Sequence, residues 1–125
     1  MKKEIIISIN PEHVKSIFQG IKKYEYRTKT TKSPISKLII YATAPIKRIV
    51  GEVEVLGVLS MPPKQLWEET KEHSGITKAF FDNYFNKRTI AYAYCLGTIK
   101  VYEKQKKLEE YGLRFAPRSY VYKKF

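Results

Sequence analysis

The sequence has one cysteine, Cys95, among its 125 residues, and no apolar run long enough to cross a membrane. A lone cysteine cannot form an internal disulfide or a cysteine-rich zinc site, and such a sequence is typical of a reducing compartment. A membrane-spanning helix needs about 18 or more consecutive apolar residues, and the first residues do not resemble an apolar signal-peptide core. We therefore predict a cytoplasmic protein with no membrane partner.

The usual signatures of metals and cofactors are also missing. The two histidines, His13 and His73, are far apart, and neither stands at ligand spacing from Cys95 or from paired acids. The sequence contains no P-loop and no G-x-G-x-x-G motif. We therefore predict no metal site and no cofactor.

Acidic residues are scarce beside basic ones: 12 Asp and Glu face 24 Lys and Arg, for a net charge of +12. Such a balance attracts polyanions through Coulomb forces and counterion release, which favours a nucleic-acid partner. A cationic surface that serves only solubility is the alternative. The charge is uneven, because residues 61–85 carry three lysines and four acids, whereas residues 20–48 and the C-terminal end are strongly basic.

A length of 125 residues with 43% apolar side chains predicts one folded domain over residues 1–125. Gly51 and Gly57 interrupt a long strand pattern, as the bends of a small closing barrel require. Few strands are separated by helices long enough for a parallel stack. The α+β class is therefore predicted, as a small mixed or antiparallel β-barrel with short helices at its rim. We expect strands at residues 4–9, 22–28, 37–43, 47–60, 88–103 and 119–122, helical segments within 10–20, 61–85 and 108–112, and a turn at 104–107.

The stretch GIKKYEYRTK, residues 20–29, places one carboxylate, Glu25, among four cations. Strand alternation puts Glu25 and Arg27 on one face, and Gly20 permits a turn that lets Lys22 lean over the same face. Glu25 can accept hydrogen bonds from a base amine while Arg27 orients it, and Lys22 and Arg27 can hold a phosphate. The alternative is an exposed strand decorated with weak ion pairs.

Three segments of the chain resemble the ASCH domain family of the PUA-like superfamily. They are IISINPEHVKSIFQGIKKYEYR with the G-x-K-x-x-E-x-R motif (Gly20, Lys22, Glu25, Arg27), LIIYATAPIKRIVGEVEV, and LRFAPRSYVY. The resemblance covers roughly residues 4–122. It implies a PUA-like barrel with a cleft beside the motif strand, RNA or nucleotide-like ligands, and a role often labelled transcription-associated.

The candidate site extends beyond this motif. The resemblance places Tyr41 and Thr43 on a strand that passes the motif, and it places Arg118 and Ser119 in the terminal motif, within reach of a phosphate. Trp67 can cover the cleft and stack on a base, or it can anchor a helix in the core. The remaining strand tyrosines are interpreted as packing residues, and a plain surface turn is the alternative for the terminal pair.

Two other functions stay open. Some small members of the family hydrolyse an acylated cytidine with a Lys, a Thr and a Glu. Lys22 matches, but Glu25 stands in the place of the Thr, and the third residue is not assigned between Glu68 and Ser74. If the protein is a hydrolase, Lys22 and Glu25 are its catalytic residues. A protein-interaction module that uses the helices of residues 61–85 is the other alternative.

Overall fold

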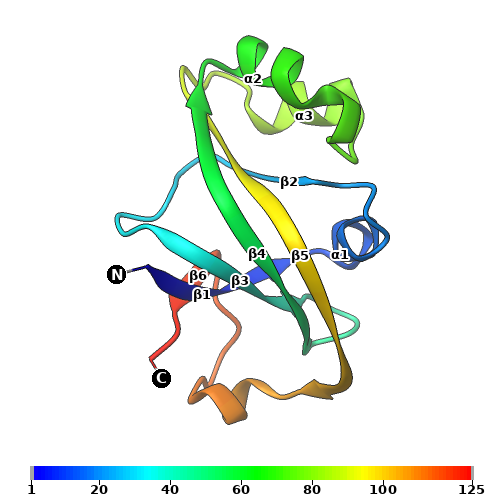
Figure 1. The fold of residues 1–125 in the computed structure, drawn as a ribbon, viewed down its shortest axis with the longest axis vertical. Helices are drawn as coiled ribbons and strands as arrows, with labels where there is room; N and C mark the ends of the chain where they lie inside the picture. The colour runs from blue at the N-terminus through cyan, green and yellow to red at the C-terminus, as the bar shows by residue number, and fades with distance from the viewer. Residues whose placement is uncertain (1, 125) are drawn as a thin grey trace.

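Six strands form one curled sheet in the computed structural model, which describes residues 2–124 (Figure 1). The strands are β1 (Lys3–Ile9), β2 (Tyr24–Arg27), β3 (Ile35–Ala42), β4 (Arg48–Met61), β5 (Ala91–Lys106) and β6 (Tyr120–Tyr122). The helices are α1 (Pro11–Phe18), α2 (Pro63–Thr70) and α3 (Lys78–Tyr84), with single 3-10 turns η1 (Lys71–His73) and η2 (Leu108–Tyr111). The predicted α+β class and element order are confirmed.

The strand order is β2-β5-β4-β3-β1-β6, so β2 and β6 are the two edges of the sheet. Only β1 and β3 pair in parallel, and the other neighbours are antiparallel, as expected for a mixed sheet. The turn expected at residues 104–107 is wrong, because β5 continues to Lys106, which pairs with Ile49 of β4. Hydrogen bonding to the neighbouring strand outweighs the polar composition of that segment.

The expected bends of the long strand are confirmed, because the pairing of β4 with β5 shifts register at Gly51 and again at Gly57. A Cβ on Gly51 would lie 2.5 Å from the carbonyl oxygen of Lys100 and 2.7 Å from Cζ of Phe18. Only glycine lets β4, β5 and the end of α1 approach so closely. The bend therefore brings α1 against the curled sheet.

Apolar side chains gather in three clusters that fix the helices around β2. The first fills the curl of the sheet and includes Val14 and Ile17 of α1. In the second, Leu66 of α2 and Phe81 of α3 pack against Tyr26 of β2. The third lies under η2. Figure 1 shows α2 and α3 at one end of the paired strands β4 and β5, and α1 beside these strands. β2 crosses between α1 and the pair of helices α2 and α3. Within residues 2–124, no helix is long and apolar enough to span a bilayer.

Candidate functional site

Lys22 reaches the inner side of β2 because the chain turns sharply after α1. Gly20 has a φ of +78°, a left-handed conformation that favours glycine. The backbone N–H of Lys23 then donates to the carbonyl oxygen of His73 at 2.9 Å, which ties this turn to η1. As a result Lys22 is only 4% exposed, and its Nζ donates to the carbonyl oxygen of Ser74 at 3.0 Å.

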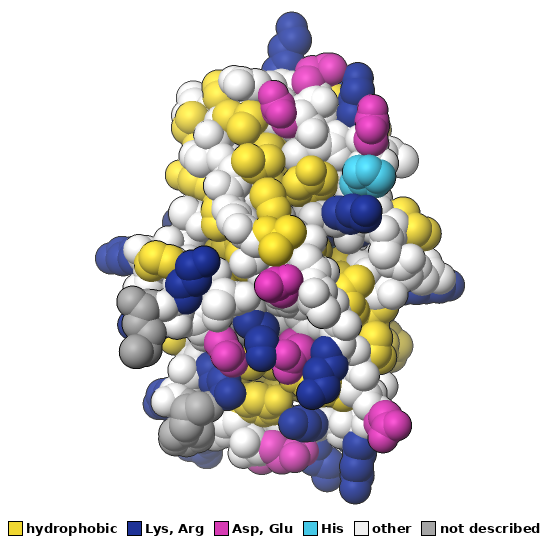
Figure 2. All heavy atoms as spheres, in the orientation of Figure 1, with side chains coloured by type: hydrophobic (Ala, Val, Ile, Leu, Met, Phe, Trp, Pro, Cys, Tyr) yellow, Lys and Arg dark blue, Asp and Glu magenta, His cyan; other side chains and the backbone are white. Residues whose placement is uncertain are grey.

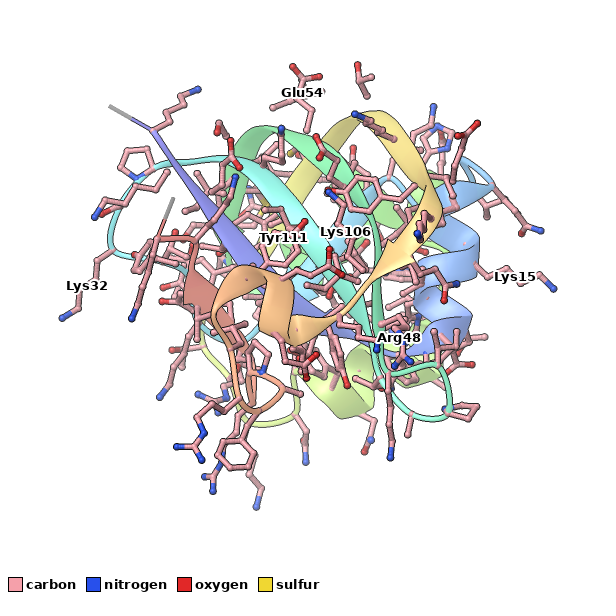
Figure 3. The ribbon with its side chains drawn as sticks, turned by 90° about the horizontal axis from the view of Figure 1, so that it is seen from below. Lys15, Lys32, Arg48, Glu54, Lys106 and Tyr111 are labelled. Atoms are coloured by element: carbon pink, nitrogen blue, oxygen red, sulfur yellow. The ribbon has the colours of Figure 1, made fainter. Side chains whose placement is uncertain are left out.

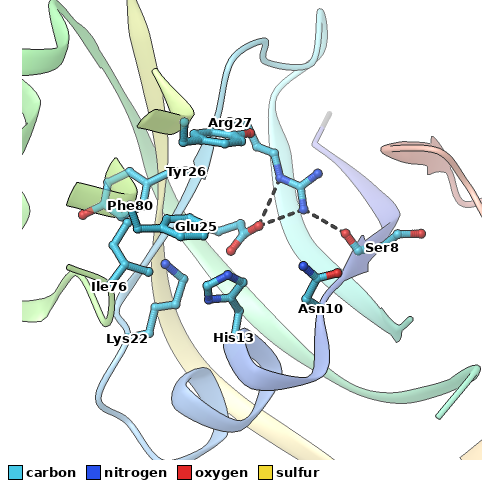
Figure 4. Close-up of a pocket in the computed structure, with 10 residues that line it drawn as sticks. Ser8, Asn10, His13, Lys22, Glu25, Tyr26, Arg27, Ile76 and Phe80 are labelled. Atoms are coloured by element: carbon cyan, nitrogen blue, oxygen red, sulfur yellow. Dashed lines mark hydrogen bonds and ion pairs between the residues drawn. The ribbon is translucent and has the colours of Figure 1, made fainter. Parts of the chain in front are cut away.

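Glu25 and Arg27 lie on one face of β2, as strand alternation predicts, and they form a close ion pair (Figure 4). Oε2 of Glu25 accepts from Nε of Arg27 at 3.0 Å and from its terminal nitrogen NH2 at 2.8 Å. Glu25 is 6% exposed, and its Oε1 has no hydrogen-bond partner among residues 2–124. Every fully buried side-chain N or O atom of the described chain has a hydrogen-bond partner. Because Oε1 has none, it is not fully buried, and it opens into the adjacent pocket that Glu25 lines.

The guanidinium of Arg27 also joins both edges of the sheet. Its NH2 donates to the backbone carbonyl of Ser8 in β1 at 2.9 Å, and its NH1 donates to Oγ of Ser119 at 3.3 Å, just before β6. The curled sheet is therefore closed at this point by a side chain, where β2 and β6 make no backbone ladder. Most donors of Arg27 are already used, so it serves mainly to position Glu25 and the two edges.

A pocket of about 220 Å³ opens above this ion pair. Lys22 and Glu25 lie at its base, α1 supplies His13, and α3 supplies two exposed rings, Phe80 at 45% and Tyr84 at 38%. These groups place one cation, one carboxylate oxygen, one imidazole and two aromatic rings around one hollow. No three His, Cys, Asp or Glu side chains converge anywhere in residues 2–124, so the donor set does not suit a metal. The complete lining is Ser8, Asn10, His13, Lys22, Glu25, Tyr26, Arg27, Ile76, Phe80 and Tyr84.

Burial lowers the pKa of the Lys22 ammonium, with Arg27 adding to the effect and Glu25 opposing it. The same ammonium lies 4.7 Å from the centre of the Tyr26 ring, which favours its charged form. Tyr26 itself is fixed by a 2.7 Å hydrogen bond between its hydroxyl and Oγ1 of Thr70, and burial raises its pKa to about 12. The base of the pocket is therefore rigid, and its lysine is a stronger proton donor than an exposed one.

His13 should titrate below 6.5, because burial and the nearby Lys22 and Arg27 lower its pKa, while Glu25 and Glu12 oppose the shift. At a pH between the lowered pKa and the ordinary value, His13 is therefore mostly protonated in the unfolded chain and mostly neutral in the folded protein. The free energy of unfolding should therefore fall as the pH drops from above 6.5 through the lowered pKa. NMR titration of the imidazole measures the midpoint, and His13→Gln should flatten this part of the stability curve. A midpoint at or above 6.5 would contradict the geometry.

The remaining sequence-predicted residues divide into two groups. Thr43 donates to Oδ1 of Asn10 at 3.1 Å, and Ser119 contacts Arg27, so each contacts a lining residue without lining the pocket itself. Tyr41 lies in the cluster under η2, because strand alternation puts it with Ile39 on the face of β3 opposite Ile40. The Trp67 ring is half-buried, its centre lies 5.0 Å from that of Phe81 at the edge of the second cluster, and it does not line the pocket. Arg118 is exposed and does not line it either.

Sequence reasoning missed the pocket residues that come from β1, α1 and α3. Asn10 stands just before α1, where its side chain makes no capping bond and accepts from Thr43 instead. His13 follows three residues later on the same face of the helix. Phe80 and Tyr84 stand four apart on α3, which is a usable signal of a shared face. Their neighbours Phe81 and Phe85 form the buried side, and the sequence does not distinguish the two pairs.

The chain matches the family model of the ASCH domain over residues 7–116. The fold is similar to the crystal structure of ASCH from Zymomonas mobilis, with a TM-score of 0.87 and 26% identity over 96% of this chain and 87% of that one. An ASCH domain-containing ribonuclease of Zymomonas mobilis is 29% identical over 96 residues, which is 76% of this chain and 65% of that protein.

Two proteins of Ureaplasma parvum are also similar across nearly the whole chain. They are ATP synthase subunit alpha, 27% identical over 98% of this chain, and large ribosomal subunit protein uL22, 29% identical over 96%. The chain spans only 16% of the first and 39% of the second.

Proposed function

Because this chain belongs to the ASCH domain family, we propose that it binds RNA and holds one nucleotide of the strand in the pocket around Lys22, Glu25 and Arg27. The observation that carries the proposal is the buried Lys22–Glu25–Arg27 group, which faces a pocket rather than open water. The ribonuclease name of one relative supports an RNA-related role.

The pocket chemistry matches the parts of a nucleotide. Oε1 of Glu25 is an acceptor for an exocyclic amine, and Lys22 retains two ammonium donors after its bond to Ser74. The exposed rings of Phe80 and Tyr84 offer faces on which a base can stack. At about 220 Å³ the pocket is smaller than the roughly 300–1,000 Å³ of drug-sized sites, and it suits a single base or phosphate.

Lys22→Met should weaken the binding of short RNA by roughly 10- to 150-fold, because a buried hydrogen bond to a charged group contributes about 1.5–3 kcal/mol. Its exposed neighbour gives the matched control, since Lys23→Met removes the same charge outside the pocket. Fluorescence anisotropy with RNA hexamers compares them, and thermal unfolding checks that both variants fold. Equal losses for the two variants would contradict the proposal.

A second candidate is phosphodiester or amide cleavage, favoured by the lowered pKa of Lys22. The neutral form of this amine can take the proton of an RNA 2′-hydroxyl as its oxygen bonds to the adjacent phosphorus. The bond from that phosphorus to the 5′-oxygen breaks, and the 5′-oxygen takes a proton from the resulting ammonium. Amide hydrolysis has less support, because Glu25 replaces the family's Thr and one of its oxygens is committed to Arg27.

Incubation with RNA, with the same strand lacking 2′-hydroxyls, and with acylated cytidines separates these activities from binding alone. Products formed by the wild type and lost in Lys22→Met would support catalysis. If all three substrates remain intact, binding is the only function of the pocket that remains proposed.

A further inference from the structure

An open, basic groove lies along the edge formed by β1 and β6. Four lysines line it, Lys2, Lys3, Lys123 and Lys124, with Tyr120 and Tyr122 between them. β6 is the last strand of the sheet, so no further strand covers this edge within residues 2–124. The groove is separate from the pocket and shares no lining residue with it.

Most of the positive charge in this groove is uncompensated. Its one acidic side chain, Glu4, lies 3.5 Å from Lys123 and 3.9 Å from Lys37. No ion pair within residues 2–124 involves Lys2, Lys3 or Lys124. The lower half of the face in Figure 2, where β1 and β6 lie, carries both basic and acidic side chains, so the groove is a basic part of a mixed surface.

The groove has an ordered wall. The Lys3 ammonium lies 4.9 Å from the centre of the Tyr122 ring. The hydroxyl of Tyr122 accepts from the backbone N–H of Ser33 at 3.4 Å, which ties β6 to the loop of residues 28–34. That loop carries Lys32, which extends into solvent on the side of the molecule where β6 lies (Figure 3). Residues from three separate segments therefore add positive charge along one edge.

Two of these segments start at the pocket. The loop of residues 28–34 follows Arg27 directly, and the strand of residues 120–122 follows Ser119 directly. Arg27 and Ser119 are in contact at 3.3 Å, so both segments lead from the rim of the pocket to the groove. In an extended chain the path from Ser119 to Lys123 is about 13 Å, at roughly 3.3 Å per residue.

We infer that this groove is a second contact surface for single-stranded RNA. It binds the phosphates of the nucleotides adjacent to the one held in the pocket. The inference rests on the proposed function, because the pocket defines where the strand starts. A second copy of this chain is a poor occupant, since a symmetric contact would bring the same lysines together. Phosphates of a flexible strand suit a row of lysines that provides charge without base selection.

The test compares a groove variant, Lys3→Gln with Lys124→Gln, against a control of equal charge, Lys64→Gln with Lys104→Gln. The control lysines are exposed and lie outside both sites. Fluorescence anisotropy follows a ten-nucleotide RNA between 50 and 200 mM salt, on the order of the range over which phosphate contacts are lost. Each lost phosphate contact reduces the slope of log affinity against log salt by about 0.7 for a single strand.

The groove variant should reduce this slope by about 1.4 and weaken binding more than the control does. The groove variant should bind a nucleoside monophosphate as tightly as the wild type does, as measured by the NMR signals of His13. Equal slopes for the groove and control variants would overturn the inference. A monophosphate that does not bind while the ten-nucleotide RNA still depends on Lys3 and Lys124 would instead reject the pocket and keep the groove. Tighter groove-dependent binding of polyglutamate than of RNA would assign the groove to an acidic protein and overturn the RNA inference.

Discussion

Arg27→Met should lower the free energy of unfolding by about 3–5 kcal/mol, the usual result of leaving a buried charge without its partner. The side chains of Arg27 and Glu25 are 16% and 8% exposed, so water replaces little of the lost pairing. The variant also removes the donor to the Ser8 carbonyl and the contact with Ser119. Because these bonds join both sheet edges, their loss should destabilise the whole sheet. The urea concentration at the midpoint of unfolding should therefore be lower.

A double variant separates the ion pair from the other contacts of Arg27. Arg27→Met combined with Glu25→Gln leaves no buried charge unpaired, so it should regain part of the stability lost in Arg27→Met alone. Arg118→Met is the control for removal of an exposed arginine, and it should change stability by less than about 0.5 kcal/mol. Equal midpoints for Arg27→Met and Arg118→Met would show that the ion pair is not buried as described.

Gly75→Ala should displace Lys22 from the base of the pocket. A Cβ at this position would lie 2.5 Å from Cβ and 2.9 Å from Cγ of Lys22, and Gly75 has a φ of +68°. The left-handed backbone costs an alanine roughly 1–2 kcal/mol, and overpacking typically adds about 1–3 kcal/mol. We therefore expect a loss of about 2–5 kcal/mol in stability. RNA binding should also weaken to the level of Lys22→Met.

Gly112→Ala is a control that isolates the clash. Gly112 has a φ of +75°, so the backbone penalty is similar, but nothing lies within 4 Å of its added Cβ. It should lose only about 1–2 kcal/mol and retain RNA binding. If Gly75→Ala matched this control in both urea unfolding and RNA affinity, the position of Lys22 would not depend on the turn at Gly75.

The sequence predicts the parts of the site that depend on local periodicity. Alternation along β2 places Glu25 and Arg27 together, and the left-handed turn at Gly20 carries Lys22 toward them, as the structure shows. The predicted fold is likewise confirmed by the strand order and by the similarity to ASCH of Zymomonas mobilis. The two-residue period of strands and the three-to-four-residue period of helices are sufficient to predict these features.

The sequence does not predict features that depend on packing between distant segments. Alternation puts Tyr41 on the same face of β3 as Ile39, but only the packing of η2 against that face shows that it points away from the pocket. The position of Lys22 depends on Gly75, fifty-three residues later, which leaves room for the Lys22 side chain. No local pattern in the sequence connects these two residues. The aromatic side of α3 that faces the pocket depends on which pair, Phe80 and Tyr84 or Phe81 and Phe85, packs on α2 and β2.

The central claim is that the pocket beside β2 receives one RNA nucleotide. It is tested most directly by NOE spectroscopy of the protein with each of the four homopolymeric RNA hexamers. For at least one hexamer, we predict contacts between nucleotide protons and the rings of His13, Phe80 and Tyr84. If the hexamers bind but their contacts lie only on other surfaces, with none to these three rings, the claim is contradicted.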